Sequence, residues 1–167
     1  MPLWRREGFV EDVWTAIGEG DAPASGPVIV PLKRWLADRA ALDERADPVG
    51  VVVEAGADAQ DHLADLAQRP LVALAFAKFV DGRAFSYARL LRDRYAFDGE
   101  LRAIGEVLID EIPLMLRCGF DSFAVTNAPT LRMLEAGQLP APRLHYQRSS
   151  DRSEAAVAAT PWRSVDD

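Results

Sequence analysis

The stretch Val49-Gly50-Val51-Val52-Val53 decides the fold class of this chain. It is rich in β-branched residues, with Pro48 before it and Glu54-Ala55-Gly56 after it. A short apolar run between turn residues is typical of a strand that is buried on both faces. Strands of this kind belong to sheets that are covered by helices on both sides, so the neighbouring segments should alternate between strand and helix.

The segments on either side show this alternation. Short apolar runs predict further strands at 28–30, 71–79, 101–108 and 123–125. Apolar residues spaced three and four apart predict helices at 32–42, 59–68, 84–95, 110–118 and 128–136. Alternation at this spacing is typical of parallel strands joined by right-handed crossovers. The sequence therefore predicts an α/β fold with a small, mostly parallel sheet.

So few strands cannot close an eight-unit barrel within one chain. We expect either an open sheet or a partial barrel that pairs with a copy of itself as a homodimer, and the sequence does not separate the two. Residues 1–27 end in a loop rich in breaker residues and are predicted to form an N-terminal arm. Residues 28–146 form the single domain, and residues 147–167, which lack an apolar period, are predicted to form a flexible tail.

Composition excludes several classes of protein. Nineteen Lys and Arg residues against twenty-six Asp and Glu residues give a net charge of −7, and polyanions repel such a chain. The single cysteine, Cys118, forbids an intramolecular disulfide, and no export signal or bilayer-spanning apolar stretch is visible. We therefore expect a cytoplasmic protein that binds neither nucleic acid nor membrane.

Polar residues follow the predicted strands, whose carboxyl ends should share one edge of the sheet. The densest segment is 76–83, where Gly82 would tolerate positive φ and admit a ligand, and Arg83 would offer donors to a carboxylate, phosphate or sulfur oxyanion. A structural role, with Asp81 capping a helix and Arg83 pairing with a carboxylate, is at least as well supported. The candidate ligand- or partner-binding residues are Lys78, Asp81, Gly82, Arg83, Tyr87, Arg89, Arg92, Glu106, Asp110 and Arg117.

Signals for a cofactor are lacking in the sequence. His62 and His145 have no metal-ligand spacing, and the chain carries no glycine-rich dinucleotide turn or phosphate loop. Cys118 is predicted to be a buried, unreactive thiol. We expect no cofactor and no metal.

The strings 78–83, 86–92, 99–105 and 117–121 together resemble a bacterial family of uncharacterised proteins whose members are commonly described as probable oxidoreductases involved in sulfite reduction. The resemblance covers about Val28 to Val125, and one departure is Ala77, where the family usually has proline. Sulfite reduction uses a haem-type centre coupled to an iron–sulfur cluster, and such clusters need several cysteine ligands. With one cysteine, this chain cannot be that catalytic subunit.

The resemblance therefore implies a cytoplasmic accessory protein of assimilatory sulfite reduction. It would bind the sulfite reductase, its electron donor or a small anion through the face from Lys78 to Arg92. One alternative is a small cofactor-independent enzyme whose pocket uses Lys78, Asp81, Arg83, Glu106 and Asp110, with a carboxylate or lysine transferring a proton. Another is a structural oligomerisation module.

Overall fold

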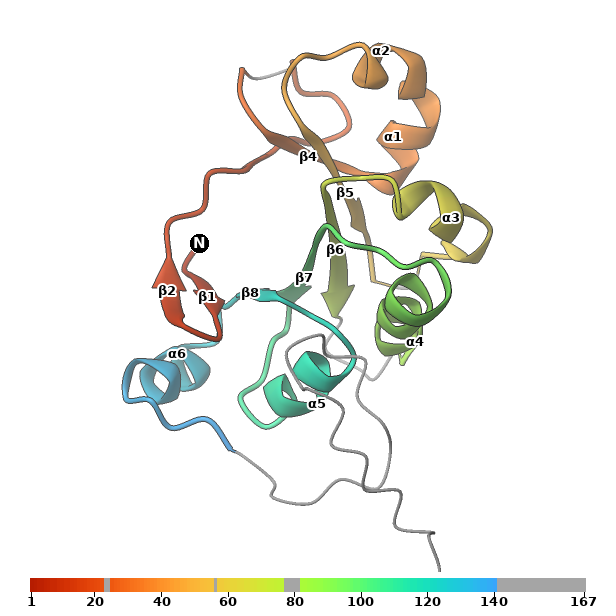
Figure 1. Ribbon diagram of the computed structural model, residues 1–167. Coiled ribbons are helices and arrows are strands. Elements are labelled where there is room, and N and C mark those ends of the chain that lie inside the picture. The colour runs from red at the N-terminus through yellow and green to blue at the C-terminus, as the bar shows by residue number, and fades with distance from the viewer. Residues whose placement is uncertain (23–24, 56, 77–81, 141–167) are drawn as a thin grey trace, which may run out of the picture.

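An eight-stranded sheet, curled into a half-barrel, organises the chain (Figure 1). The computed structural model describes residues 1–22, 25–55, 57–76 and 82–140. The strand order is β2-β1-β8-β7-β6-β5-β4-β3. The six strands from β3 to β8 are parallel to one another, whereas β1 is antiparallel to both β8 and β2. The predicted α/β class with a mostly parallel sheet is confirmed, and of the two predicted forms the sheet takes the partial barrel.

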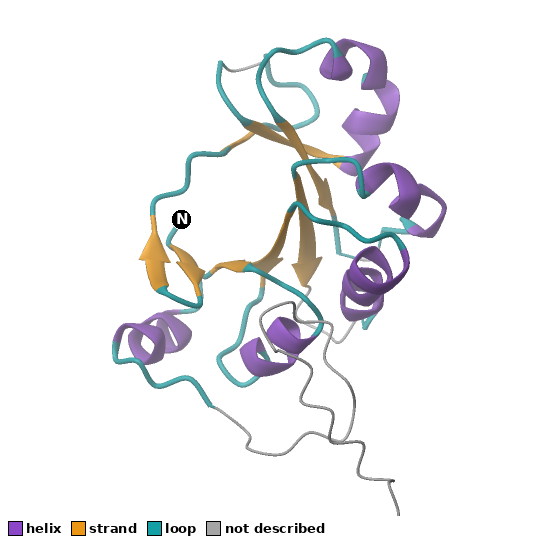
Figure 2. Cartoon of the chain, in the orientation of Figure 1, coloured by secondary structure: helices purple, strands orange, loops and turns teal. Residues whose placement is uncertain are grey.

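The helices flank the outer side of the curled sheet, as the colouring by secondary structure shows (Figure 2). The strands are β1 (Leu3–Arg5), β2 (Gly8–Val10), β3 (Thr15–Ala16), β4 (Val28–Pro31), β5 (Val49–Val53), β6 (Leu71–Phe76), β7 (Glu100–Gly105) and β8 (Ser122–Ala124). The helices are α1 (Leu32–Ala37), α2 (Arg39–Asp43), α3 (Leu63–Leu66), α4 (Arg83–Arg89), α5 (Ile112–Arg117) and α6 (Ala128–Glu135), with a 3-10 turn η1 (Gln60–His62) and a π-helical turn η2 (Leu90–Arg94).

Burial on both faces explains why β6 is almost wholly apolar. Val72 and Leu74 pack into the main core beneath the helices, while Leu71 and Ala73 belong to a smaller cluster on the opposite, concave face. Alternate residues of a strand point to opposite faces, so a strand covered on both sides is apolar throughout. The neighbours β5 and β7 pair with β6 in parallel, which brings the carboxyl ends of all three to one rim.

Several predicted elements are shorter than their patterns indicated. The helix expected at 32–42 is interrupted at Asp38, and the one expected at 59–68 is a 3-10 turn followed by a single α-helical turn. The strand expected at 101–108 ends at Gly105, whose φ of 86° leaves the extended region. Gly119 has φ 96° and ends α5, as expected for a left-handed stop.

The N-terminal residues, expected as a loosely attached arm, instead supply three strands to the sheet. Leu3 and Trp4 are buried, and the Trp4 ring lies 5.6 Å from the ring of Phe123 on β8. Strands of two or three residues are too short to show a period of two, so the pattern could not reveal them. The end of the predicted strand at 77–79 and the predicted tail at 147–167 lie outside the described residues.

Candidate functional site

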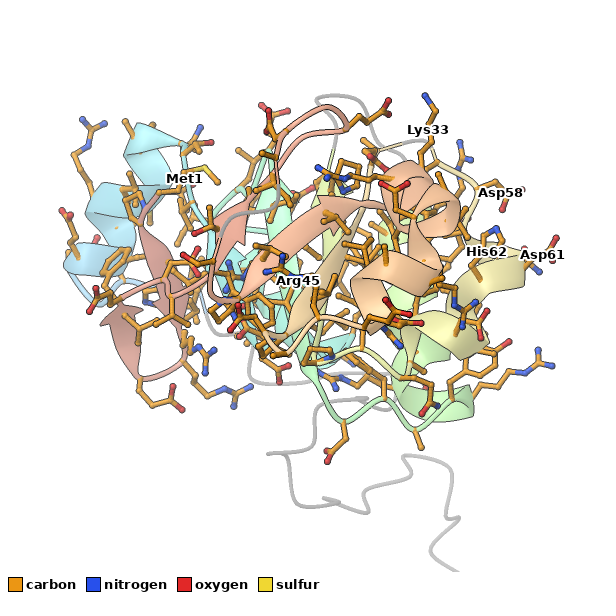
Figure 3. All side chains as sticks on the ribbon, turned by 90° about the horizontal axis from the view of Figure 1, so that it is seen from above. Met1, Lys33, Arg45, Asp58, Asp61 and His62 are labelled. Carbon is orange, nitrogen blue, oxygen red and sulfur yellow. The ribbon has the colours of Figure 1, made fainter. Side chains whose placement is uncertain are left out.

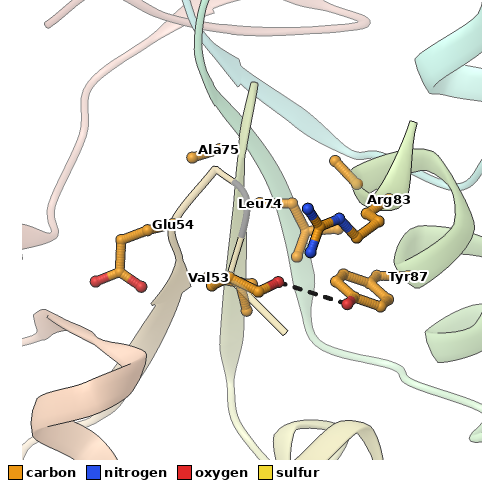
Figure 4. A pocket seen from close by; sticks show the side chains of 8 residues that line it. Val53, Glu54, Leu74, Ala75, Arg83 and Tyr87 are labelled. Carbon is orange, nitrogen blue, oxygen red and sulfur yellow. Dashed lines mark hydrogen bonds between the residues drawn. The ribbon is translucent and has the colours of Figure 1, made fainter. Parts of the chain in front are cut away.

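A small cavity opens at the carboxyl rim of the sheet, between the end of β5 and the start of α4 (Figure 4). Its volume is about 230 Å³ when the space open to solvent is included. The lining residues are Val53, Glu54, Ala57, Leu74, Ala75, Arg83, Ala84 and Tyr87. Arg83 and Tyr87 lie on one side of this cavity, and Glu54 lies on the other with its carboxylate turned away. Two of the predicted site residues are thus brought together.

The buried side chain of Tyr87 forms part of the cavity wall, and its hydroxyl is already hydrogen bonded within the protein. Its hydroxyl accepts a hydrogen bond from the backbone N–H of Ala59 at 3.3 Å. The same oxygen lies 3.5 Å from the carbonyl of Ala57 and 3.4 Å from Oδ1 of Asp58, so its one proton is directed toward that loop. Tyr87 therefore fastens the loop after β5 to α4 and fixes the shape of the cavity.

The start of α4 is exposed at the rim. Gly82 has φ −66°, and a Cβ atom placed on it would meet nothing within 4 Å. Gly82 therefore does not use its tolerance for positive φ, because the residue has helical geometry, and a side chain would be accommodated there. Arg83, the first helical residue, is exposed. Lys78 and Asp81 lie outside the described residues.

Carboxylates gather on the loop that follows β7. The backbone N–H of Glu106 donates to the carbonyl of Phe76 at 3.0 Å, which ties this loop to the end of β6. Burial raises the pKa of Glu111, and the negative charges of Asp110 and Glu106 raise it further. Within the described ranges, no group of three His, Cys, Asp or Glu residues is placed to hold a metal ion.

Arg92 is a structural residue at the opposite, amino end of the sheet. Its side chain is 3% exposed and donates to the carbonyls of Phe97, Gly99 and Gly119, the last at 2.9 Å, and it pairs with Asp121. The π-helical turn η2 contains Arg92, and a π turn shifts the side chains that follow it around the helix axis. The prediction that Arg92 belongs to an exposed binding face is wrong, because periodicity assumed a regular α-helix.

The other two predicted arginines lie away from the cavity's lining. Arg89, on α4, has its Nε 3.8 Å from a carboxylate oxygen of Asp93 on the surface of the helix. Arg117 ends α5 and is half-buried. Cys118 follows it and is buried, as predicted, and this burial raises the pKa of its thiol. A raised thiol pKa leaves little nucleophilic thiolate near neutral pH.

Sequence reasoning missed a second charged cluster, beside the concave face. Glu100 accepts hydrogen bonds from Arg102 and from the hydroxyl of Ser122, and its other oxygen accepts from Arg5 at 2.6 Å. Arg102, with 3% of its side chain exposed, also pairs with Asp12 at 2.8 Å. Members of this cluster are up to 95 residues apart in sequence, so no local motif announces it. The one signal is a pair of charged residues inside a strand that is otherwise apolar.

A groove borders this cluster at the amino end of the sheet. Its volume is about 1270 Å³, including space open to solvent. Arg5, Arg6, Asp98, Glu100 and Asp121 are among its lining residues. Charges of both signs face this groove, so its electrostatics select neither an anion nor a cation.

Comparison with known proteins identifies one family. A family model described as a bacterial protein of unknown function (DUF934) matches residues 50–157, which is about two thirds of the chain. No curated protein and no solved structure matches. Within the part of the chain that the structure describes, no helix is both long and apolar enough to cross a bilayer.

Proposed function

We propose that this chain, which belongs to the DUF934 family of bacterial proteins, is an accessory protein of assimilatory sulfite reduction. It binds the reductase, its electron donor or a small anion through the outer surface of α4. We call this surface the α4 face and define it by Gly82, Arg83, Ser86 and Arg89, all of which reach solvent. Arg92, which sequence analysis assigned to this face, is excluded because it is buried.

The observation that carries the proposal is that Arg92 connects three of the four strings that resemble the family. Arg92 ends the string 86–92, and its acceptors Gly99, Gly119 and Asp121 belong to the strings 99–105 and 117–121. Two later segments of the chain thus hold the helix that carries the string 86–92. The fourth string, 78–83, ends at the start of that same helix. The residues that resemble the family therefore position α4 and its exposed face.

The size and charge of the rim favour a partner or small anion over a large cofactor. Binding sites for drug-sized ligands usually enclose about 300–1,000 Å³, and the space enclosed beside Arg83 is far smaller, at about 10 Å³. Arg83 and Arg89 supply guanidinium groups, which bind carboxylates and oxyanions through paired N–H donors. An acidic protein surface or a small oxyanion such as sulfite suits these donors.

Deletion and co-purification test the proposal. We expect deletion of the gene to abolish growth that depends on sulfite, and we expect the tagged chain to co-purify with the reductase or its electron donor. Arg83→Ala should weaken that association and leave the thermal unfolding midpoint unchanged. Lys33→Ala on α1 is the matched control, because this lysine is 80% exposed and lies outside the α4 face. Normal growth together with no captured partner would remove the basis of the proposal.

A small enzyme is the second candidate function, and the raised pKa of Glu111 favours it. A carboxyl that stays protonated to higher pH than usual can act as a general acid. Glu106 and Asp110 precede it on the loop after β7, and their negative charges contribute to this raised pKa. A reaction of this kind would show a rate that falls as pH rises and would be lost in Glu111→Gln, whereas partner binding would survive that substitution.

A further inference from the structure

We propose that Arg102 binds a small oxyanion on the concave face of the sheet, and that the carboxylate of Asp12 fills this site until the oxyanion displaces it. The site is separate from the α4 face. Arg5, Ser122 and Arg102 lie in one row across the adjacent strands β1, β8 and β7. All three side chains donate hydrogen bonds to the carboxylate of Glu100. The row therefore consists of side chains that already bind one carboxylate.

The charged cluster around this row has unused hydrogen-bond donors. Among the described residues, the guanidinium of Arg102 uses three of its five N–H groups: Nε and Nη2 donate to Glu100, and Nη1 donates to Asp12. Nε of Arg5 is buried and has no hydrogen-bond partner among these residues. Each carboxylate oxygen of the cluster, by contrast, accepts at least one hydrogen bond, including Oδ1 of Asp12 from the backbone N–H of Trp14. Unused donors beside occupied acceptors favour an anion over a cation as the ligand.

Asp12 belongs to a segment that lies outside the hydrogen-bonded sheet. Strands β2 and β3 form the two opposite edges of the sheet, and residues 11–14, which we call the strap, join one edge to the other. The strap crosses the open side of the half-barrel, and none of its residues belongs to a helix or strand (Figure 1). Met1, before β1, lies apart from Lys33, after β4, when the molecule is seen from above (Figure 3). Glu100, in contrast, lies within β7, so it cannot leave the row without breaking the sheet.

Two side chains of the strap hold it against the concave face. Asp12 and Trp14 are partly buried, whereas the two residues that alternate with them are exposed. Trp14 packs on the concave apolar cluster that contains Ala73, the register partner of Arg102. An oxyanion that binds Arg102 in place of Asp12 removes one of these two contacts. Binding of the oxyanion and release of the strap are therefore coupled.

The exchange also keeps the charge of Arg102 compensated. The cluster contains two arginines and two carboxylates, so it is neutral with Asp12 in place and has a net charge of +1 without it. A buried guanidinium without a counter-ion is unfavourable, and an oxyanion presents two oxygens that match its paired donors. Further carboxylates near the cluster are exposed, so salt screens their repulsion: Glu7, Glu11 and Asp98. Asp121 is already paired with Arg92.

Chemical rescue of Asp12→Ala by formate and by sulfate tests the site. Formate supplies the carboxylate that the variant lacks, and sulfate is a larger oxyanion. We expect at least one of the two to raise the thermal unfolding midpoint of Asp12→Ala saturably, beyond the effect of chloride at equal ionic strength. Its apparent dissociation constant should be at least about tenfold lower for Asp12→Ala than for the unmodified chain, because the tethered carboxylate competes with the free anion.

Asp38→Ala is the matched control, because Asp38 also pairs with a buried arginine, Arg34, at the end of α1. The double variant Asp12→Ala/Arg102→Met should lose the response to the anion. Asp12→Ala/Arg83→Ala should keep it, because Arg83 belongs to the α4 face. Equal stabilisation of Asp12→Ala and Asp38→Ala by the anions, or no stabilisation of Asp12→Ala, would overturn the proposal.

Asp12→Asn covers the case in which Asp12→Ala fails to fold. Asparagine keeps the size of the side chain and an acceptor for the backbone N–H of Trp14, but it lacks the charge. The same stabilisation by the anion is expected, with the same dependence on Arg102. Hydrogen exchange of the strap should be faster in Asp12→Asn than in the unmodified chain, and the bound anion should not slow it. An anion that restores the protection of the strap would contradict displacement and overturn the proposal.

Discussion

Replacing Arg92 by methionine tests whether the core of this fold depends on a buried cation. The side chain is 3% exposed and is hydrogen bonded to three backbone carbonyls and to Asp121. Methionine keeps most of the apolar volume and removes every donor. The carbonyls of Phe97, Gly99 and Gly119 then lose the guanidinium as their partner, and Asp121 loses its counter-ion.

The expected cost follows from the burial of these partners. Removing one member of a buried ion pair typically costs about 3–5 kcal/mol when the remaining charge stays buried, but the side chain of Asp121 is 34% exposed, so water can replace part of the lost pairing. Backbone N–H of Leu101 still donates to Asp121 at 2.8 Å, which places the expected loss near the lower end, at about 3 kcal/mol. For a domain of this size, that loss lowers the unfolding midpoint by roughly 6–12 °C.

Urea denaturation followed by circular dichroism measures this loss directly. Arg83→Met is the matched control, since Arg83 is exposed and its substitution should change the free energy of unfolding by less than about 0.5 kcal/mol. Gly119→Ala is a second test of the same network and should also lower the free energy of unfolding. A Cβ atom at Gly119 would lie 2.5 Å from Cγ of Arg92, and the residue has φ 96°. If Arg92→Met costs no more than Arg83→Met, the reasoning from burial is refuted.

Three further outcomes are expected. The raised pKa of Glu111 means that ionisation of this carboxyl destabilises the folded state, and the destabilisation grows as pH rises above 4.5. Glu111→Gln should therefore be more stable than the unmodified protein at pH 7, by up to about 1 kcal/mol. In urea titrations below pH 4.5, the difference in stability should vanish. Cys118 should react with a thiol reagent only as fast as the protein opens, and rapid labelling of the native state would contradict its burial. Trp4→Ala should lower the free energy of unfolding by about 3–5 kcal/mol if β1 is part of the core. An unchanged free energy of unfolding would instead support a loosely attached N-terminal arm.

The fold class was predictable because burial on both faces leaves a strong signal in the sequence. The runs at 49–53 and 71–76 are apolar throughout, and the patterns between the strands have helical spacing. The half-barrel could not be selected over an open sheet, because curvature depends on how strands stagger and twist across the sheet. The strands β1 to β3 were missed because they have only two or three residues each and are held in the sheet by long-range contacts, such as that of Trp4 on Phe123.

The candidate site was only partly predictable for a related reason. Arg83 and Tyr87 follow one strand directly, and they do meet at one cavity. The buried pair of Arg102 and Asp12, by contrast, joins segments 90 residues apart. The sequence around an arginine on a helix does not show whether its side chain faces solvent or the core. The π turn that places Arg92 inside also has no recognisable local sequence pattern.

Arg92 also changes what the resemblance to the family can mean. Residues that recur together are often taken to mark a binding surface, yet the strings 86–92, 99–105 and 117–121 are joined by the bonds of one buried side chain. A network of this kind has a structural requirement for its glycines and its carboxylate, whatever the protein binds. The residues left to explain function are those that the network positions but does not use, namely Gly82, Arg83, Ser86 and Arg89. Substitutions of Arg83 or Arg89 should therefore reduce partner binding without loss of stability, whereas Arg92→Met should reduce both together.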